Sequence, residues 1–151
     1  MTHLKVGDPA PDFEAKDQNG NLVKLSDFKG KKIILYFYPK DLTPGCTAEA
    51  INLTENYETL KAKGYEVIGV STDDEKKHQK FIEKYNIPYM LIADTDKKVV
   101  NLYGVWGPKK FMGREYEGIH RTTFVIDENG IIEKIIEKVN TKDHTNQILN
   151  D

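Results

Sequence analysis

The sequence predicts an α/β fold in which a mixed central sheet is flanked by helices and preceded by an N-terminal β-hairpin. Two apolar runs of strand length, at 33–38 and 65–72, are typical of strands buried on both faces of a sheet. Amphipathic segments of helix length alternate with these runs, as in a layered α/β sandwich. No internal repeat or long linker interrupts the pattern, so residues 1–151 are expected to form a single domain.

The first elements follow from turn residues and apolar runs. Residues 12–25, DFEAKDQNGNLVKL, predict a hairpin with QNGN as its turn. Ser26 is expected to cap a single helical turn that ends before Gly30. The run IILYFY at 33–38 is then the first central strand, and Pro39 ends it.

The middle of the chain alternates helix and strand. A helix is predicted over 47–63, with Gly64 in the left-handed conformation at its C-terminus. The second central strand is YEVIGVST at 65–72, and a charged amphipathic helix follows over 73–85. MLIA at 90–93 reads as a short third strand.

The C-terminal third contains one ambiguous segment. A short helix is predicted over 97–103 and a strand over 121–127, followed by the turn Glu128-Asn129-Gly130. The apolar residues of 131–139 match a helical period, but the turn favours a hairpin and nine residues are few for a helix, so a strand is predicted. A helix over 141–149 closes the chain.

Composition excludes several classes of protein. Hydrophobic residues make up 38% and charged residues 30% of the chain, with a net charge of −2, so no global field favours nucleic acid or an anionic membrane. No apolar run approaches the length of a membrane span, and the segment MTHLKVGDPAPDF lacks the features of a signal peptide. A single cysteine cannot form an internal disulfide, which argues for the reducing cytoplasm. The four histidines show no metal-ligand spacing, and His120 is more readily a surface residue than a site residue.

The lone cysteine, Cys46, lies in the segment PKDLTPGCTAEA at the start of a predicted helix. It begins the apolar stripe of that helix, which continues through Ala50, Leu53, Tyr57 and Leu60. Backbone N–H groups in the first helical turn lack helical acceptors, and the helix dipole favours an anion there. Both effects favour the reactive thiolate over the thiol, but a nearby fixed cation, most simply an arginine, is also needed.

The residues before Cys46 have more than one interpretation. Thr43-Pro44-Gly45-Cys46 has the outline of a Cys-x-x-Cys motif with threonine in the first position, which excludes dithiol chemistry. Thr43 is either a hydroxyl that serves the thiol or only a turn residue. Pro39 is either part of the site or only the residue that ends a strand.

The segment PKDLTPGCTAEA matches the peroxiredoxin signature P-x-x-x-[TS]-x-x-C-x-x-E. Together with KKFMGREYEGIHRTTFVIDENG downstream, it resembles the bacterioferritin-comigratory-protein branch of the peroxiredoxins, also called Q-type, over nearly the whole chain. The resemblance implies a thioredoxin-like fold and thiol-dependent reduction of hydrogen peroxide and alkyl hydroperoxides. It implies no metal and no organic cofactor.

The resemblance also implies a role for each of five residues. Cys46 is the peroxidatic cysteine, whose thiolate attacks a peroxide oxygen. Thr43 hydrogen-bonds the peroxide, and Pro39 shields the thiolate from water. Arg121 is the cation that holds both thiolate and peroxide, and Glu49 orients the polar network around it.

One position departs from this branch. Its members commonly carry a resolving cysteine five residues after the peroxidatic one, and Ile51 stands at that position here. Isoleucine is either natural to a one-cysteine protein or a replacement of the resolving cysteine. In both cases an external thiol, namely thioredoxin, glutaredoxin or a small thiol, must reduce oxidised Cys46. We expect a monomer or weak homodimer.

Two rival functions remain from the sequence. A peroxide sensor or thiol relay would use oxidation of Cys46 without bulk turnover, and a chaperone or interaction domain would not need Cys46 at all. Four aromatic residues before Arg121 are expected to pack in the core or a loop, or to line a peroxide path or a dimer face; they are Tyr103, Trp106, Phe111 and Tyr116.

Overall fold

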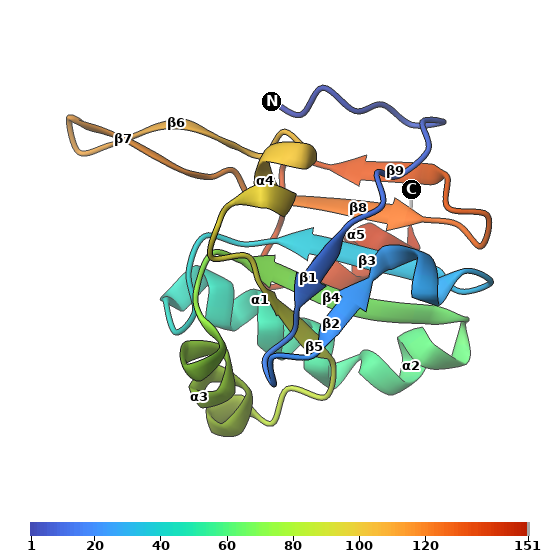
Figure 1. The fold of residues 1–151 in the computed structure, drawn as a ribbon. Helices are drawn as coiled ribbons and strands as arrows, with labels where there is room; N and C mark the ends of the chain where they lie inside the picture. Colours follow the sequence, from blue (N-terminus) through green and yellow to red (C-terminus); the bar gives the residue numbers. More distant parts are fainter. Residues whose placement is uncertain (151) are drawn as a thin grey trace.

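The computed structural model describes residues 1–150, which fold around a five-stranded mixed sheet (Figure 1). The strand order is β5-β4-β3-β8-β9, and β3 pairs in parallel with β4 and antiparallel with β8. The mixed sheet predicted from the sequence is therefore confirmed. Its strands are β3 (Lys32–Phe37), β4 (Tyr65–Ser71), β5 (Met90–Ala93), β8 (Thr122–Ile126) and β9 (Ile132–Ile136).

The N-terminal hairpin is present as predicted, with β1 (Glu14–Lys16) paired antiparallel to β2 (Leu22–Lys24). Its turn is closed by Asp17, whose Oδ1 accepts the backbone N–H of Asn21 at 3.0 Å. Gly20 has φ +78°, a left-handed conformation that favours glycine. A short side chain at Asp17 and a glycine in the turn thus fix the hairpin locally.

The helical turn after the hairpin forms, but Ser26 does not cap it. The 3₁₀ helix η1 (Leu25–Phe28) has Lys24 as its N-cap, and the side chain of Asp27 accepts the Lys24 N–H at 3.1 Å. The prediction for Ser26 was wrong by two residues: the N-cap is Lys24, and Asp27 accepts its N–H.

The long helix predicted over 47–63 is two helices, α1 (Pro44–Glu55) and α2 (Tyr57–Ala62). The first begins three residues earlier than predicted, because proline is well accommodated in the first helical turn. The break lies at Asn56, whose side-chain amide donates to the carbonyl of Asn52 at 2.8 Å. Such a side-chain hydrogen bond competes with the helical ladder.

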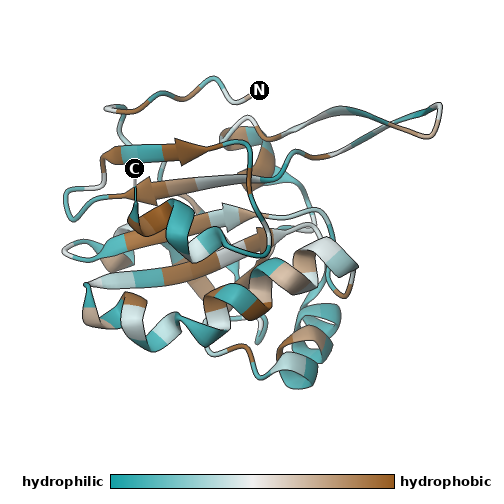
Figure 2. Ribbon diagram, turned by 180° about the vertical axis from the view of Figure 1, so that it is seen from behind, coloured by the Kyte–Doolittle hydropathy of each residue, from teal (hydrophilic) through white to brown (hydrophobic). Residues whose placement is uncertain are grey.

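Helices and sheet form layers. Helices α1 and α2 cover one face of the sheet together with α5 (His144–Leu149), which begins three residues later than predicted (Figure 2). Helix α3 (Glu75–Tyr85) lies at the β5 side of the sheet, and its Phe81 joins the apolar cluster under α1. The hairpin β1–β2 and the short α4 (Lys98–Leu102) cover the opposite face (Figure 1).

Strand β3 separates two apolar clusters because successive side chains point to opposite faces of a sheet. Ile33, Leu35 and Phe37 belong to the cluster under the hairpin and α4. Ile34, Tyr36 and Tyr38 belong to the cluster under α1, which also contains Cys46. Residues 33–38 are therefore buried on both faces, as the unbroken apolar run predicted.

A second hairpin was not predicted. Strands β6 (Trp106–Phe111) and β7 (Arg114–Ile119) pair antiparallel and project from the body of the protein as an arm (Figure 1). The two-residue loop Met112-Gly113 has positive φ at both positions, as in a type I′ turn. A two-residue loop ending in glycine was the available signal, but methionine is not a typical first residue of such a turn.

The four aromatic residues before Arg121 have different environments. Tyr103 is fully buried in the core, and Trp106 packs against the same cluster. Phe111 and Tyr116 lie on the projecting arm and are 65% and 46% exposed. Within residues 1–150, no helix is both long and apolar enough to span a membrane.

Candidate active site

Cys46 is the third residue of α1, directly after the loop that leaves β3. Its side chain is only 1% exposed, because it starts the buried stripe of the helix. Thr47 donates its N–H to the carbonyl of Thr43 at 2.8 Å, so the first intrahelical bond begins one residue beyond the cysteine. The N–H groups of Gly45 and Cys46 therefore precede the helical ladder and can donate to a bound anion.

Arg121 supplies the cation that the helix start needs. Its Nη2 donates to Cys46 Sγ at 3.4 Å, and its Nη1 donates to Glu49 Oε1 at 2.7 Å. Burial alone would lower the pKa of Arg121, but the negative charges of Glu49 and Cys46 outweigh burial and raise it. The guanidinium is therefore a permanent charge shared between the sulfur and a carboxyl group.

Glu49 lies one helical turn after Cys46 and its side chain is fully buried. Burial raises the pKa of Glu49 to about 7, because the opposing effect of Arg121 offsets only part of the cost of burying a charge. Its second oxygen, Oε2, lies 3.4 Å from Nε2 of His144 on α5. No motif or spacing in the sequence indicates that His144 belongs to this network.

Thr43 and Pro39 are placed by the loop between β3 and α1. The Thr43 hydroxyl donates to the carbonyl of Lys40 at 2.8 Å, so it does not cap the helix and its lone pairs can accept a hydrogen bond. Pro39 is partly exposed and directly follows the buried end of the central strand. Neither side chain forms a hydrogen bond with the sulfur, so their roles remain predictions.

Two further residues shape the surroundings of Arg121. A Cβ at Gly45 would lie 3.2 Å from Arg121 Nη2, so glycine allows the guanidinium to approach the helix start. Lys109, on β6, donates to the carbonyl of Ile119 at 2.8 Å. Burial and the charge of Arg121 lower the pKa of Lys109, against the opposing effect of Cys46. Lys109 is thus a second cation near the sulfur that the sequence did not reveal.

The loop that carries Thr43 is anchored by a buried ion pair. Asp41 Oδ2 lies 2.5 Å from Nδ1 of His78 on α3, and both side chains are 0% exposed. His78 Nε2 lies 2.8 Å from the carbonyl oxygen of Ile92. Both ring nitrogens face oxygen atoms, and although burial lowers the pKa of His78, the hydrogen bond and charge of Asp41 outweigh it and raise the pKa, which favours the imidazolium with protons on both nitrogens. His78, Asp41 and Asp73 lie close enough for a metal ion, but an imidazolium has no lone pair to offer one.

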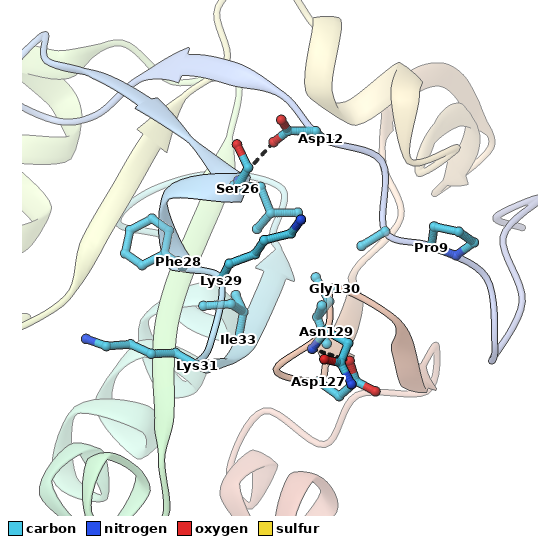
Figure 3. Close-up of a pocket in the computed structure, with 13 residues that line it drawn as sticks. Pro9, Asp12, Ser26, Phe28, Lys29, Lys31, Ile33, Asp127, Asn129 and Gly130 are labelled. Atoms are coloured by element: carbon cyan, nitrogen blue, oxygen red, sulfur yellow. Dashed lines mark hydrogen bonds between the residues drawn. The ribbon is translucent and has the colours of Figure 1, made fainter.

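A cavity of about 270 Å³ lies beside Ile33, near the start of β3 (Figure 3). It is lined by residues that include Ser26, Phe28, Lys29 and Asn129, and by none of the five predicted site residues. Cys46 follows the C-terminal end of β3, whereas this cavity surrounds the N-terminal end at Ile33. The cavity is therefore separate from the site.

A thioredoxin-like fold with one buried thiol at a helix start, held by an arginine, defines a thiol-dependent peroxidase. The sequence pattern of the AhpC/TSA family matches residues 6–135. Peroxiredoxin Bcp of Escherichia coli is 45% identical over 150 residues, which cover 99% of this chain and 96% of that protein. Peroxiredoxin Bcp of Bacillus subtilis is 47% identical over 146 residues, covering 97% and 93%.

Solved structures agree with the sequence relatives. A PrxQ mutant from Xylella fastidiosa superposes with a TM-score of 0.92 at 27% identity, covering 99% of this chain and 96% of that one. The bacterioferritin comigratory protein of Xanthomonas campestris, described for its alkyl peroxide reduction activity, gives 0.89 at 28%, covering 99% and 95%. This chain belongs to the AhpC/TSA family and is a Bcp/PrxQ-type peroxiredoxin with one cysteine.

Proposed function

We propose that this chain is a single-domain, one-cysteine peroxidase that reduces hydrogen peroxide and alkyl hydroperoxides in the cytoplasm, as a monomer or weak homodimer. The observation that carries the proposal is the contact of Arg121 Nη2 with Cys46 Sγ at 3.4 Å, at the start of a helix. The alkyl peroxide activity of the Xanthomonas campestris protein supports this substrate class.

The geometry supports a direct displacement at oxygen. The Cys46 thiolate attacks one peroxide oxygen, an S–O bond forms, the O–O bond breaks, and the leaving oxygen takes up a proton. Arg121 and the N–H groups at the helix start stabilise the charge that develops on the peroxide oxygens. Thr43, whose proton is donated to Lys40, accepts the O–H of the peroxide and aligns it. Pro39 shields the thiolate from water, and Glu49 holds the guanidinium in place.

An external thiol completes the cycle, since Cys46 is the only cysteine in the chain. The thiol attacks the sulfenic acid, releasing water and forming a mixed disulfide. A second thiol then displaces Cys46 as a thiolate and leaves with the first as a disulfide. Thioredoxin, glutaredoxin and small thiols are all chemically competent for both steps.

Peroxide consumption tests the proposal, measured with thioredoxin, glutaredoxin and dithiothreitol side by side. The parent protein should turn over repeatedly with at least one of them, and Cys46→Ser should not, while retaining its circular dichroism spectrum. Repeated turnover by Cys46→Ser would contradict the proposal. Consumption of a single equivalent of peroxide, with every reductant, would instead favour a sensor.

A further inference from the structure

The carboxyl group of Glu49 is buried with only one of its oxygens hydrogen-bonded. Oε1 accepts from Arg121, but Oε2 has no hydrogen-bond donor among residues 1–150. Nε2 of His144 lies 3.4 Å from Oε2, and both side chains are 0% exposed. An ionised Glu49 would therefore leave a charged oxygen buried without a partner, which is costly.

The protons of His144 follow from its other contacts. Gln147 donates from Nε2 to the carbonyl of Lys138 at 2.9 Å and accepts the N–H of Asn140 through Oε1 at 2.8 Å. The same Oε1 lies 2.9 Å from His144 Nδ1. Since this oxygen can only accept, Nδ1 carries the proton, and Nε2 of the neutral ring has a lone pair. Thr123 Oγ1 lies 2.8 Å from Nε2 and can donate to it.

Without a further proton, Oε2 of Glu49 faces the lone pair of His144 Nε2, so two acceptors oppose each other. One additional proton is needed between them. Burial lowers the pKa of His144, partly opposed by Gln147 and assisted by Arg121, whereas burial raises the pKa of Glu49. Both directions favour a neutral pair with the proton on Glu49. The proton on Oε2 removes the buried charge and faces Nε2, whose single lone pair can accept from either Glu49 or the Thr123 hydroxyl, while Oε1 still accepts from Arg121.

The other ionisable groups around Glu49 do not supply this proton. Tyr36 on β3 and Tyr89 before β5 interact with Glu49, and burial raises the pKa of both phenols, so they stay neutral near neutral pH. Their hydroxyl groups hydrogen-bond each other at 2.7 Å. The charges of Arg121 and Cys46 act on the pKa of Lys109 in opposite directions. Glu49 is thus the titrating group that shares Arg121 with the thiolate.

One guanidinium serves two groups that can each carry a negative charge. While Cys46 is a thiolate, the charge of Arg121 is divided, and neutral Glu49 is favoured. Once the sulfur is a neutral sulfenic acid, the whole charge of Arg121 acts on Glu49 and favours its carboxylate. We propose that Glu49, backed by His144, holds one proton while Cys46 is a thiolate and releases it when Cys46 is oxidised.

This inference rests on the proposed function and specifies the proton and charge balance of its first step, the oxidation of Cys46 by peroxide. The Cys46 thiolate, ROOH and protonated Glu49 become the Cys46 sulfenic acid, ROH and ionised Glu49. Sulfur gives two electrons to the leaving oxygen, which takes a proton from water, while Glu49 returns a proton to water. The site therefore keeps its net charge, and oxidation takes up no net proton. Glu49 and His144 touch none of the reacting atoms; both act through Arg121 and are positioning residues.

Proton uptake in a single turnover tests this proposal, using the reduced protein, one equivalent of hydrogen peroxide and a pH indicator near neutral pH. The parent protein should take up less than half a proton per Cys46 oxidised. Glu49→Gln keeps an acceptor for Arg121 but carries no titrating proton, so it should take up one. Glu55→Gln changes an exposed residue of the same helix and should behave as the parent.

The mass of the product separates this proposal from the proposed function. If hydrogen peroxide adds no oxygen to Cys46, the proposed function fails; if it does and the parent takes up one proton, only the present inference is overturned. An infrared difference spectrum of the parent alone covers the case in which Glu49→Gln does not fold. Oxidation should replace a carboxylic-acid carbonyl band by carboxylate bands, and an unchanged carboxyl region would overturn the inference.

Discussion

Replacing Asp41 by Asn should destabilise the protein strongly, because it leaves a buried cation without its partner. Asp41 accepts from Tyr38 OH at 2.5 Å and pairs with His78, which carries protons on both nitrogens. Asparagine keeps the shape of the side chain and removes its charge. The backbone N–H of Asp41 donates to Asp73 at 2.8 Å and is unchanged by the substitution, so the loop before Cys46 loses only its side-chain anchor.

The size of the effect follows from burial, because neither Asp41 nor His78 is exposed. Removing one partner of such a pair costs about 3–5 kcal/mol, a large part of the roughly 5–15 kcal/mol that stabilises a typical domain. With a urea dependence of about 2 kcal/mol per molar, the unfolding midpoint should fall by on the order of 2 M. Urea unfolding followed by circular dichroism measures this shift.

The effect should also depend on pH. Burial alone would lower the pKa of His78, but the hydrogen bond and charge of Asp41 outweigh it and raise the pKa above its usual value of 6.5. The stabilisation from this pair is fully present below about pH 6.5 and is lost as pH rises through the pKa in the folded protein. The difference between parent and Asp41→Asn should therefore be largest near pH 6 and shrink toward pH 9.

Glu83→Gln provides the matched control, because Glu83 is an exposed acidic residue on the same helix as His78. It should change the free energy of unfolding by less than about 0.5 kcal/mol. If Asp41→Asn costs less than about 1 kcal/mol, with no dependence on pH, then His78 is not a buried cation and the reasoning is wrong.

Three further predictions concern the site. Replacing Arg121 by Met should raise the pH midpoint of Cys46 alkylation with iodoacetamide, by on the order of one pH unit. Arg114→Met, on the exposed arm, should leave the midpoint unchanged. Equal midpoints for parent and Arg121→Met would exclude Arg121 as the cation. Gly45→Ala should slow the oxidation of Cys46 by peroxide several-fold in stopped-flow measurements, because the added Cβ would crowd the Arg121 guanidinium. An unchanged rate would show that the guanidinium adjusts. In Ile51→Cys, treatment with peroxide should produce an internal disulfide between residue 51 and Cys46, once the helix unwinds locally. Mass spectrometry should show a loss of about two daltons. Persistent sulfenic acid would show that the helix does not unwind.

Much of the fold could be predicted from the sequence because its signals are local. The apolar run at 33–38, the glycine turn of the first hairpin and the motif around Cys46 each act within a few residues. The strand predicted over 131–139 follows from the turn before it and from its short length, and β9 confirms the strand. The arm formed by β6 and β7 was missed because Met112-Gly113 is a weak turn signal.

The site was only partly predictable, for a physical reason. The residues next to Cys46 are enough to place it at a helix start. Its cation, Arg121, lies 75 residues further along the chain, and only the family resemblance suggested it. Nothing in the sequence around His78 or His144 indicates that either is buried. Each becomes part of a polar network only when distant elements pack together, since α3 meets the loop after β3 and α5 meets α1. Local sequence thus determined where the thiol lies, whereas tertiary packing decided which charges and protons surround it, because electrostatic partners depend on distance in space rather than along the chain.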